Sequence, residues 1–147
     1  MTYAPAVEKI EKALEQVKNV ILATANKSGA VSARSMALVN DGLTVYMQTD
    51  NKFDKVRDIN ENPNVAISFA FYSFKGKAKI VGHPRNNKVF IAKLKDKHLK
   101  TYNSYTELPD EVLIEIELTE ARIWGDETIT IVDLINKTVK QQICDKM

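Results

Sequence analysis

The sequence predicts a mainly β fold with short helices, built on an antiparallel sheet that curls into a small barrel. Segments in which apolar and polar residues alternate fill the middle of the 147-residue chain. Alternation with a period of two is typical of strands that bury one face. Tight turns join most of these segments to their neighbours in sequence, which is typical of antiparallel pairing. Closing such a sheet into a barrel would remove its exposed edges.

Length and composition predict a single domain across residues 1–147. The chain is 44% hydrophobic and 27% charged, and its formal net charge is only +2. Such a balance requires no large electropositive face, so nucleic acid is not an expected partner. No apolar run approaches the roughly 20 residues that would span a bilayer. Cys144 is the one cysteine, and no signal sequence is recognisable at the N-terminus, so we expect a cytoplasmic protein.

The chain begins with an expected amphipathic helix. Its apolar residues recur at steps of three and four, and Pro5 lies near the start, where its missing N–H is harmless. The period then changes to two. Residues 19–26 and 30–39 form an expected hairpin around the turn KSG, and the turn NDG at 40–42 leads into a strand at 43–48. These three strands are expected to form a meander.

The second half continues the same pattern with two more expected helices. A helix at 51–61 ends at Asn62-Pro63, and strands follow at 64–74 and 76–82 with a bend at Lys75-Gly76. Helical spacing returns within 86–100. The clearest strand is 111–124, where isoleucine and leucine alternate with glutamate, and 128–134 adds a short strand before a polar tail. The total is five to seven strands and three short helices.

Common enzyme motifs are absent from the sequence. It contains no nucleophile elbow, phosphate-binding glycine loop, paired-cysteine metal site or HExxH, so no catalytic or metal site is predicted. His83 and His98 stand alone in polar contexts. Either could be a catalytic base or a haem ligand, but a solvated surface imidazole is the favoured interpretation. Cys144 is expected to have no role in a site.

The helix at 51–61 has a distinct apolar stripe. A rotation of about 100° per residue places Phe53, Val56 and Ile59 together, and it directs Asp54 and Asp58 roughly the opposite way. Lys52 is expected inside the stripe and Lys55 along its edge.

Two interpretations of these lysines compete. Cations beside a buried face, near the free N–H groups of a first helical turn, could bind a phosphate. Asn51 and Asp54 could instead cap an ordinary surface helix whose lysine stems lie along core residues. The pattern alone favours the surface helix.

Arg34 and Trp124 are also open to two interpretations. Arg34 shares a strand face with Met36 and Leu38, so it is either an exposed cross-strand residue or a cation held beside an apolar surface. Trp124, the single tryptophan, is either a core anchor or an aromatic wall for a planar ligand.

In their order and spacing these segments resemble the pyridoxamine 5′-phosphate oxidase-like, FMN-binding split-barrel superfamily, and especially its general stress protein branch. The resemblance covers roughly residues 7–125. It rests on ILATANKSGAVSARSMALV, LTVYMQTDNKFDKVRDINENPNVAISF, GKAKIVG and ARIW. The resemblance implies an antiparallel split β-barrel of the FMN-binding type, and a homodimer with one FMN in each of two clefts at the subunit interface.

The resemblance also implies which residues bind the cofactor. Arg34 and Lys55 would bind the flavin phosphate, with Lys52 as a substitute cation, and Trp124 would reach across from the second subunit. The strand segments expected to line the flavin are Ser35, Met36, Ala37, Gln48 and Thr49.

Departures from the family pattern limit the expected activity. Phe53-Asp54 replaces the Ser-Arg of the oxidases, and Val39 and Phe71 replace their substrate-binding lysine and glutamine. Oxidation of vitamin B6 is therefore not expected. The resemblance implies a flavin-dependent oxidoreductase that reduces a small molecule with electrons from a nicotinamide nucleotide. A non-catalytic flavin-binding stress protein and a haem-binding split barrel are the alternatives.

Overall fold

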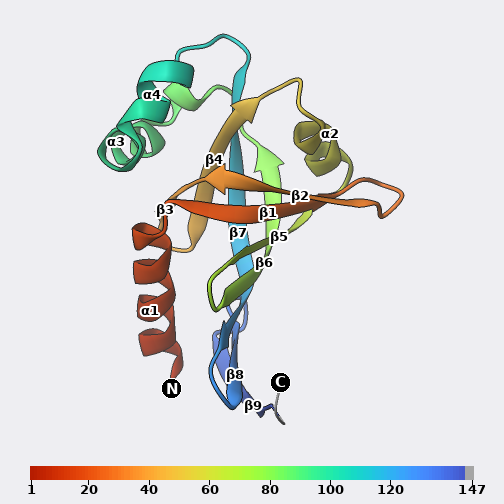
Figure 1. Cartoon of the computed structure of the whole chain (residues 1–147), viewed down its shortest axis with the longest axis vertical. Helices are drawn as coiled ribbons and strands as arrows, with labels where there is room; N and C mark the ends of the chain where they lie inside the picture. The colour runs from red at the N-terminus through yellow and green to blue at the C-terminus, as the bar shows by residue number, and fades with distance from the viewer. Residues whose placement is uncertain (145–147) are drawn as a thin grey trace.

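The structure is a computed structural model, and it describes residues 1–144. Figure 1 shows one sheet that curls around a central core, with helices at its ends and sides. In chain order the elements are α1 (Tyr3–Gln16), β1 (Asn19–Ala25), β2 (Val31–Ala37), β3 (Val39–Asp41), β4 (Thr44–Asp50), α2 (Asp54–Glu61), β5 (Asn64–Phe69), β6 (Tyr72–Ile80), a 3-10 turn (Pro84–Asn86), α3 (Lys88–Lys97), α4 (Leu99–Tyr105), β7 (Glu111–Trp124), β8 (Thr128–Asp133) and β9 (Thr138–Ile143).

The strands form one antiparallel sheet in the order β2-β1-β5-β6-β7-β4-β3, and a β8–β9 hairpin continues from β7. Strand β7 is the longest, with 14 residues. Its first part pairs with β4, its middle with β6 and its last part with β8. The predicted antiparallel split barrel is confirmed.

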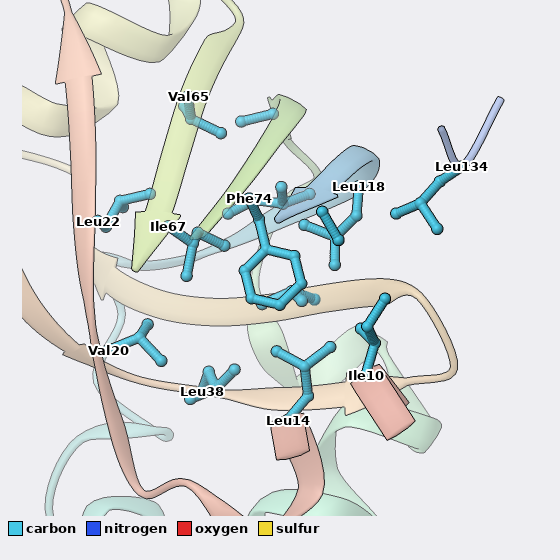
Figure 2. Packing of buried hydrophobic residues seen from close by; sticks show 14 of the residues in the cluster. Ile10, Leu14, Val20, Leu22, Leu38, Val65, Ile67, Phe74, Leu118 and Leu134 are labelled. Carbon is cyan, nitrogen blue, oxygen red and sulfur yellow. The ribbon is translucent and has the colours of Figure 1, made fainter. Parts of the chain in front are cut away.

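The main hydrophobic core fills the inside of the curled sheet. Ile10 and Leu14 of α1 are fully buried, and Figure 2 shows them pointing toward Phe74. Their spacing of four residues gives α1 the buried face that the sequence predicted. The helix thus covers one side of the barrel.

A second, smaller core holds α3 against the sheet. Phe90 is 1% exposed, and its ring packs edge-on against that of Tyr46 with centroids 6.3 Å apart. The other buried members of this cluster are Val39, Leu94 and Leu113. This contact fixes α3, and α4 follows it directly in the chain.

The predicted three-strand meander is wrong. The hairpin of β1 and β2 forms as expected, but the other edge of β1 pairs with β5, and β4 pairs with β7. Strands β2 and β4 lie near opposite ends of the strand order, so the chain crosses through β3 before it turns at Gly42. The closed shape therefore overrides pairing between sequence neighbours.

The bend predicted at Lys75-Gly76 is a bulge inside β6. The chain turns earlier, at Ala70 and Phe71, where Ala70 has a φ of +47°. A Cβ at Gly76 would lie 2.8 Å from Ile116 Cγ2 and 2.9 Å from the Glu117 carbonyl oxygen. The register shift therefore needs glycine for close approach to β7.

Apart from the 3-10 turn, three elements were not predicted, namely β3, α4 and β9, and residues 40–41 of β3 were expected to form a turn. No residue of α4 is buried, and β9 is exposed along most of its length. Neither segment therefore carries the apolar periodicity on which a prediction depends. Within residues 1–144, no helix is long and apolar enough to cross a membrane.

Candidate functional site

Arg34 lies on β2, half-buried, and its guanidinium is held by the neighbouring strand. Nη1 donates to Thr24 Oγ1 at 2.8 Å and to the Leu22 carbonyl oxygen at 3.4 Å. Arg34 is therefore a cation held in place and not a free surface side chain.

Lys55 lies in the first turn of α2 and points toward β4. Its Nζ donates to Thr49 Oγ1 at 3.0 Å and lies 4.4 Å from the centroid of the Phe53 ring. Burial lowers the pKa of Lys55, and the nearby charge of Arg34 lowers it further, while Glu111 and Asp50 act in the opposite direction.

Neither cation has a carboxylate partner in the part of the chain that the structure describes. Among residues 1–144, none of the ion pairs within 4.0 Å involves Arg34 or Lys55. Two like charges held near each other favour an anion between them, because each cation would gain a charge-assisted hydrogen bond.

A cleft of about 370 Å³ lies beside Lys55. Six of the residues predicted from the sequence line it, namely Ser35, Met36, Ala37, Gln48, Thr49 and Lys55. They come from β2, β4 and α2, which are separate in sequence. The other predicted residues, Arg34, Lys52 and Trp124, do not line the cleft.

The opposite wall of the cleft was missed by sequence reasoning. It consists of Thr101, Tyr105 and Leu108, from α4 and the loop after it, together with Glu111 at the start of β7. Asp50 and Phe53 also line the cleft and were not predicted as site residues. Burial raises the pKa of Glu111, and the Asp50 carboxylate raises it further. Because α4 has no buried face, no pattern in the sequence could identify this wall.

Lys52 is not inside the apolar stripe of α2. The helix begins at Asp54 and not at 51, so Lys52 lies in the preceding turn. Its side chain is 76% exposed and forms an ion pair with Asp110 at 3.0 Å, which raises the pKa of Lys52. A role in FMN binding stays a prediction for this residue.

The chain matches the family model described as pyridoxamine 5′-phosphate oxidase over residues 6–125. It belongs to this family. The chain is 33% identical over 136 residues to general stress protein 26 of Bacillus subtilis strain 168, an alignment that covers 82% of this chain and 91% of that protein.

Several solved structures are similar to this chain, among them the following two. A putative pyridoxamine 5′-phosphate oxidase from Listeria innocua has a TM-score of 0.66 and 22% identity, covering 80% of this chain and 97% of that one. A structure named F420 reductase has a TM-score of 0.56 and 26% identity, covering 76% and 94%. At 22% identity, the similarity to the Listeria innocua structure is evidence for the fold alone.

The two aspartates of α2, Asp54 and Asp58, differ from each other in exposure to solvent. Asp54 faces solvent as expected, with its side chain 80% exposed and paired with Arg57 at 3.5 Å. Asp58 was expected to face solvent too, but this is wrong, because it is 5% exposed and accepts a hydrogen bond from Thr24 Oγ1 at 3.1 Å. Packing of α2 against both β1 and β6 gives the helix a buried face wider than the apolar stripe.

Trp124 lies at the end of β7, thirteen residues after Glu111. At about 3.3 Å per residue, some 40 Å of strand separate the two positions. Trp124 therefore does not reach the cleft of its own chain. Its predicted contact with the flavin of a second subunit, as the pyridoxamine 5′-phosphate oxidase family implies, stays a prediction.

Both histidines bond to backbone groups, and the expectation of a solvated surface imidazole fits the exposed bonds of His83 better than the part-buried ring of His98. His83 Nε2 lies 2.8 Å from the Leu108 carbonyl oxygen, and its Nδ1 accepts from the Arg85 N–H. His98 Nε2 lies 3.0 Å from the Leu38 carbonyl oxygen, and burial lowers its pKa. Within residues 1–144, no group of three His, Cys, Asp or Glu could hold a metal ion.

A second cavity, of about 360 Å³, lies where the C-terminal ends of α1 and α3 meet. Lys97 Nζ donates to the Leu14 carbonyl oxygen at 2.9 Å, and Lys18 Nζ donates to the Lys97 carbonyl oxygen at 3.2 Å. Burial, and then the charge of Lys18, lower the pKa of Lys97 to about 8. The lysines thus link the two helix ends.

This shift makes stability depend on pH. Between about pH 8 and pH 10.5, unfolded chains bind a proton at Lys97 that folded chains have lost, so the free energy of unfolding should rise with pH. We expect Lys97→Met to lack this increment, whereas Lys93→Met in the same cavity should keep it. Urea unfolding at pH 7.5 and pH 10 measures both, and an equal pH response of wild type and Lys97→Met would refute the assignment.

Proposed function

We propose that the protein binds FMN in the cleft and acts as a flavin-dependent oxidoreductase on a small molecule. The observation that supports this best is the pair Arg34 and Lys55, two held cations without a carboxylate partner among residues 1–144, at a cleft that Lys55 lines. A phosphate dianion between them would gain two charge-assisted interactions of about 1.5–3 kcal/mol each.

The remaining lining also fits a flavin. Met36, Tyr105 and Leu108 offer apolar surface for a flat ring. Strand β2 is an edge strand that pairs with β1, and within the described residues no other strand pairs with its second edge. Backbone groups of Ser35 and Ala37 are therefore positioned to bond the polar edge of an isoalloxazine.

Asp54 does not oppose this function, although the oxidases have an arginine there. Its exposed carboxylate pairs with Arg57, and it does not contribute to the pKa of Lys55. The departure removes one possible phosphate ligand without adding a negative charge at the cleft.

Bound FMN would supply the redox chemistry, with hydride exchanged at its N5 and a nicotinamide nucleotide as the donor. The residues of this chain would bind and orient the flavin and would exclude water from it. Arg34 and Lys55 anchor the phosphate end, and the backbone of β2 aligns the ring. Tyr105 and Leu108 line the cleft on the α4 side, where they would cover the bound ring.

We further propose a homodimer with the cofactor at the subunit interface. The resemblance to the family supports it, because in that family a tryptophan at the position of Trp124 would reach the cleft from the second subunit. Size-exclusion chromatography with light scattering measures the assembly directly.

Haem binding is less well supported than flavin binding. A haem needs an axial ligand, and no histidine is among the residues that line the cleft in the described part of the chain. A deazaflavin remains a natural comparison ligand, because one similar structure is named F420 reductase.

The decisive experiment is the absorption spectrum of the purified protein, with mass spectrometry of any released ligand, followed by titration with added FMN. We expect a flavin spectrum or saturable FMN binding. A colourless protein that does not bind added FMN would contradict the proposal, and a Soret band would favour haem. Turnover of reduced nicotinamides with nitro, quinone and deazaflavin acceptors then separates an enzyme from a non-catalytic flavoprotein.

A further inference from the structure

We infer that Asp58 and Thr24 form a buried relay that positions Arg34 for an anionic ligand. The inference rests on the proposed function, which identifies the anionic group of the ligand as the phosphate of FMN. Asp58 and Thr24 are positioning residues, since both are buried and act on the ligand only through Arg34.

The relay joins three elements through one hydroxyl. Thr24 Oγ1 on β1 donates its hydrogen to Asp58 Oδ2 on α2 at 3.1 Å, and it accepts from Arg34 Nη1 on β2 at 2.8 Å. A hydroxyl has one hydrogen to donate. Since a carboxylate accepts it, the lone pairs of Thr24 remain for Arg34, and the direction of the relay is fixed.

Burial strengthens the hydrogen bonds of the relay. Thr24 is 1% exposed and Asp58 is 5% exposed, so water does not compete freely for either group. Hydrogen bonds in series polarise one another, and a hydroxyl bonded to a carboxylate becomes a better acceptor. The negative charge of Asp58 thus strengthens the hold on Arg34 without direct contact.

The hydroxyl spacer also leaves Arg34 available. A direct ion pair would occupy the guanidinium, as Asp110 occupies Lys52. Here Nη1 bonds to Thr24 and the Leu22 carbonyl, while Nη2 and Nε form no hydrogen bond with residues 1–144. Three N–H groups therefore remain for a ligand.

The test compares two variants at one position. Thr24→Val keeps the shape and removes the hydroxyl, and Thr24→Ser keeps the hydroxyl. We expect Thr24→Val to weaken FMN about tenfold while riboflavin, which lacks the phosphate, changes less than about threefold. Thr24→Ser should bind FMN nearly as wild type does. Equal weakening of FMN and riboflavin in Thr24→Val would indicate a merely structural role and overturn the inference.

A double variant covers the case in which Thr24→Val does not fold because Asp58 is left unpaired. Thr24→Val with Asp58→Leu removes both polar groups, which a packed interior tolerates better than one orphan. We expect it to fold and still to bind FMN about tenfold more weakly. Wild-type FMN affinity in this variant would overturn the relay.

A measurement without flavin separates this inference from the proposed function. In ¹⁵N spectra of the ligand-free protein, rotation of the Arg34 guanidinium should be hindered in wild type and Thr24→Ser and free in Thr24→Val. Free rotation in wild type would overturn the relay. Failure of wild type to bind FMN, with hindered rotation intact, would instead refute the identity of the ligand.

Discussion

Replacing Lys55 with alanine is expected to weaken FMN binding about tenfold or more, and Arg34→Ala should do the same. Each change removes one charge-assisted hydrogen bond of about 1.5–3 kcal/mol to the phosphate, and about 1.4 kcal/mol corresponds to a factor of ten. Quenching of flavin fluorescence on titration measures the dissociation constants. The loss should shrink at high salt, because salt screens the phosphate contacts.

Lys52→Ala is the matched control. Lys52 has the same charge and lies three residues before Lys55, but it is exposed and paired with Asp110, so we expect less than about a threefold loss. A loss as large as that of Lys55→Ala would show that Lys52 is the substitute cation suggested by the family pattern. Unchanged affinity in both Arg34→Ala and Lys55→Ala would contradict the proposed phosphate site.

Phe90→Ala should lower the free energy of unfolding by about 3–4 kcal/mol. The ring is 1% exposed and packs against Tyr46, so truncation leaves a cavity between α3 and the sheet. Because α4 follows α3 directly, the Tyr105 side of the cleft should also loosen, and FMN affinity should fall. Urea unfolding monitored by circular dichroism measures the stability.

Val89→Ala is the control for this change. Val89 precedes Phe90 on the same helix but is 46% exposed, so its truncation should cost no more than about 0.5 kcal/mol. If both variants lost equally little stability, the second core would not be holding α3 on the sheet.

The fold was predictable where burial follows a regular period. Strand β7 was placed with its bounds, and Ile114 and Ile116 are buried as the alternation indicated. The pairing of β4 with β7 was not predictable from local pattern, because it depends on how the whole sheet curls. Strand β9 is polar and exposed, so periodicity carried no signal for it.

The site was predictable in part for a different reason. The family resemblance implied Lys55 and segments of β2 and β4 as site residues, and these line one cleft in the structure. The burial of Asp58 was missed because a carboxylate on a short helix is ordinarily a surface group, and only packing of α2 against β1 shows its bond to Thr24. Tyr105 and Leu108 were missed because α4 is held by its neighbours and not by an apolar face of its own.

The comparison of FMN with riboflavin in the wild-type protein tests the central claim most directly. The two ligands share the ring and ribityl chain and differ in the phosphate. If Arg34 and Lys55 bind that phosphate, two interactions of about 1.5–3 kcal/mol each predict an FMN dissociation constant at least about 100-fold lower than that of riboflavin. Equal affinities for FMN and riboflavin would contradict the account.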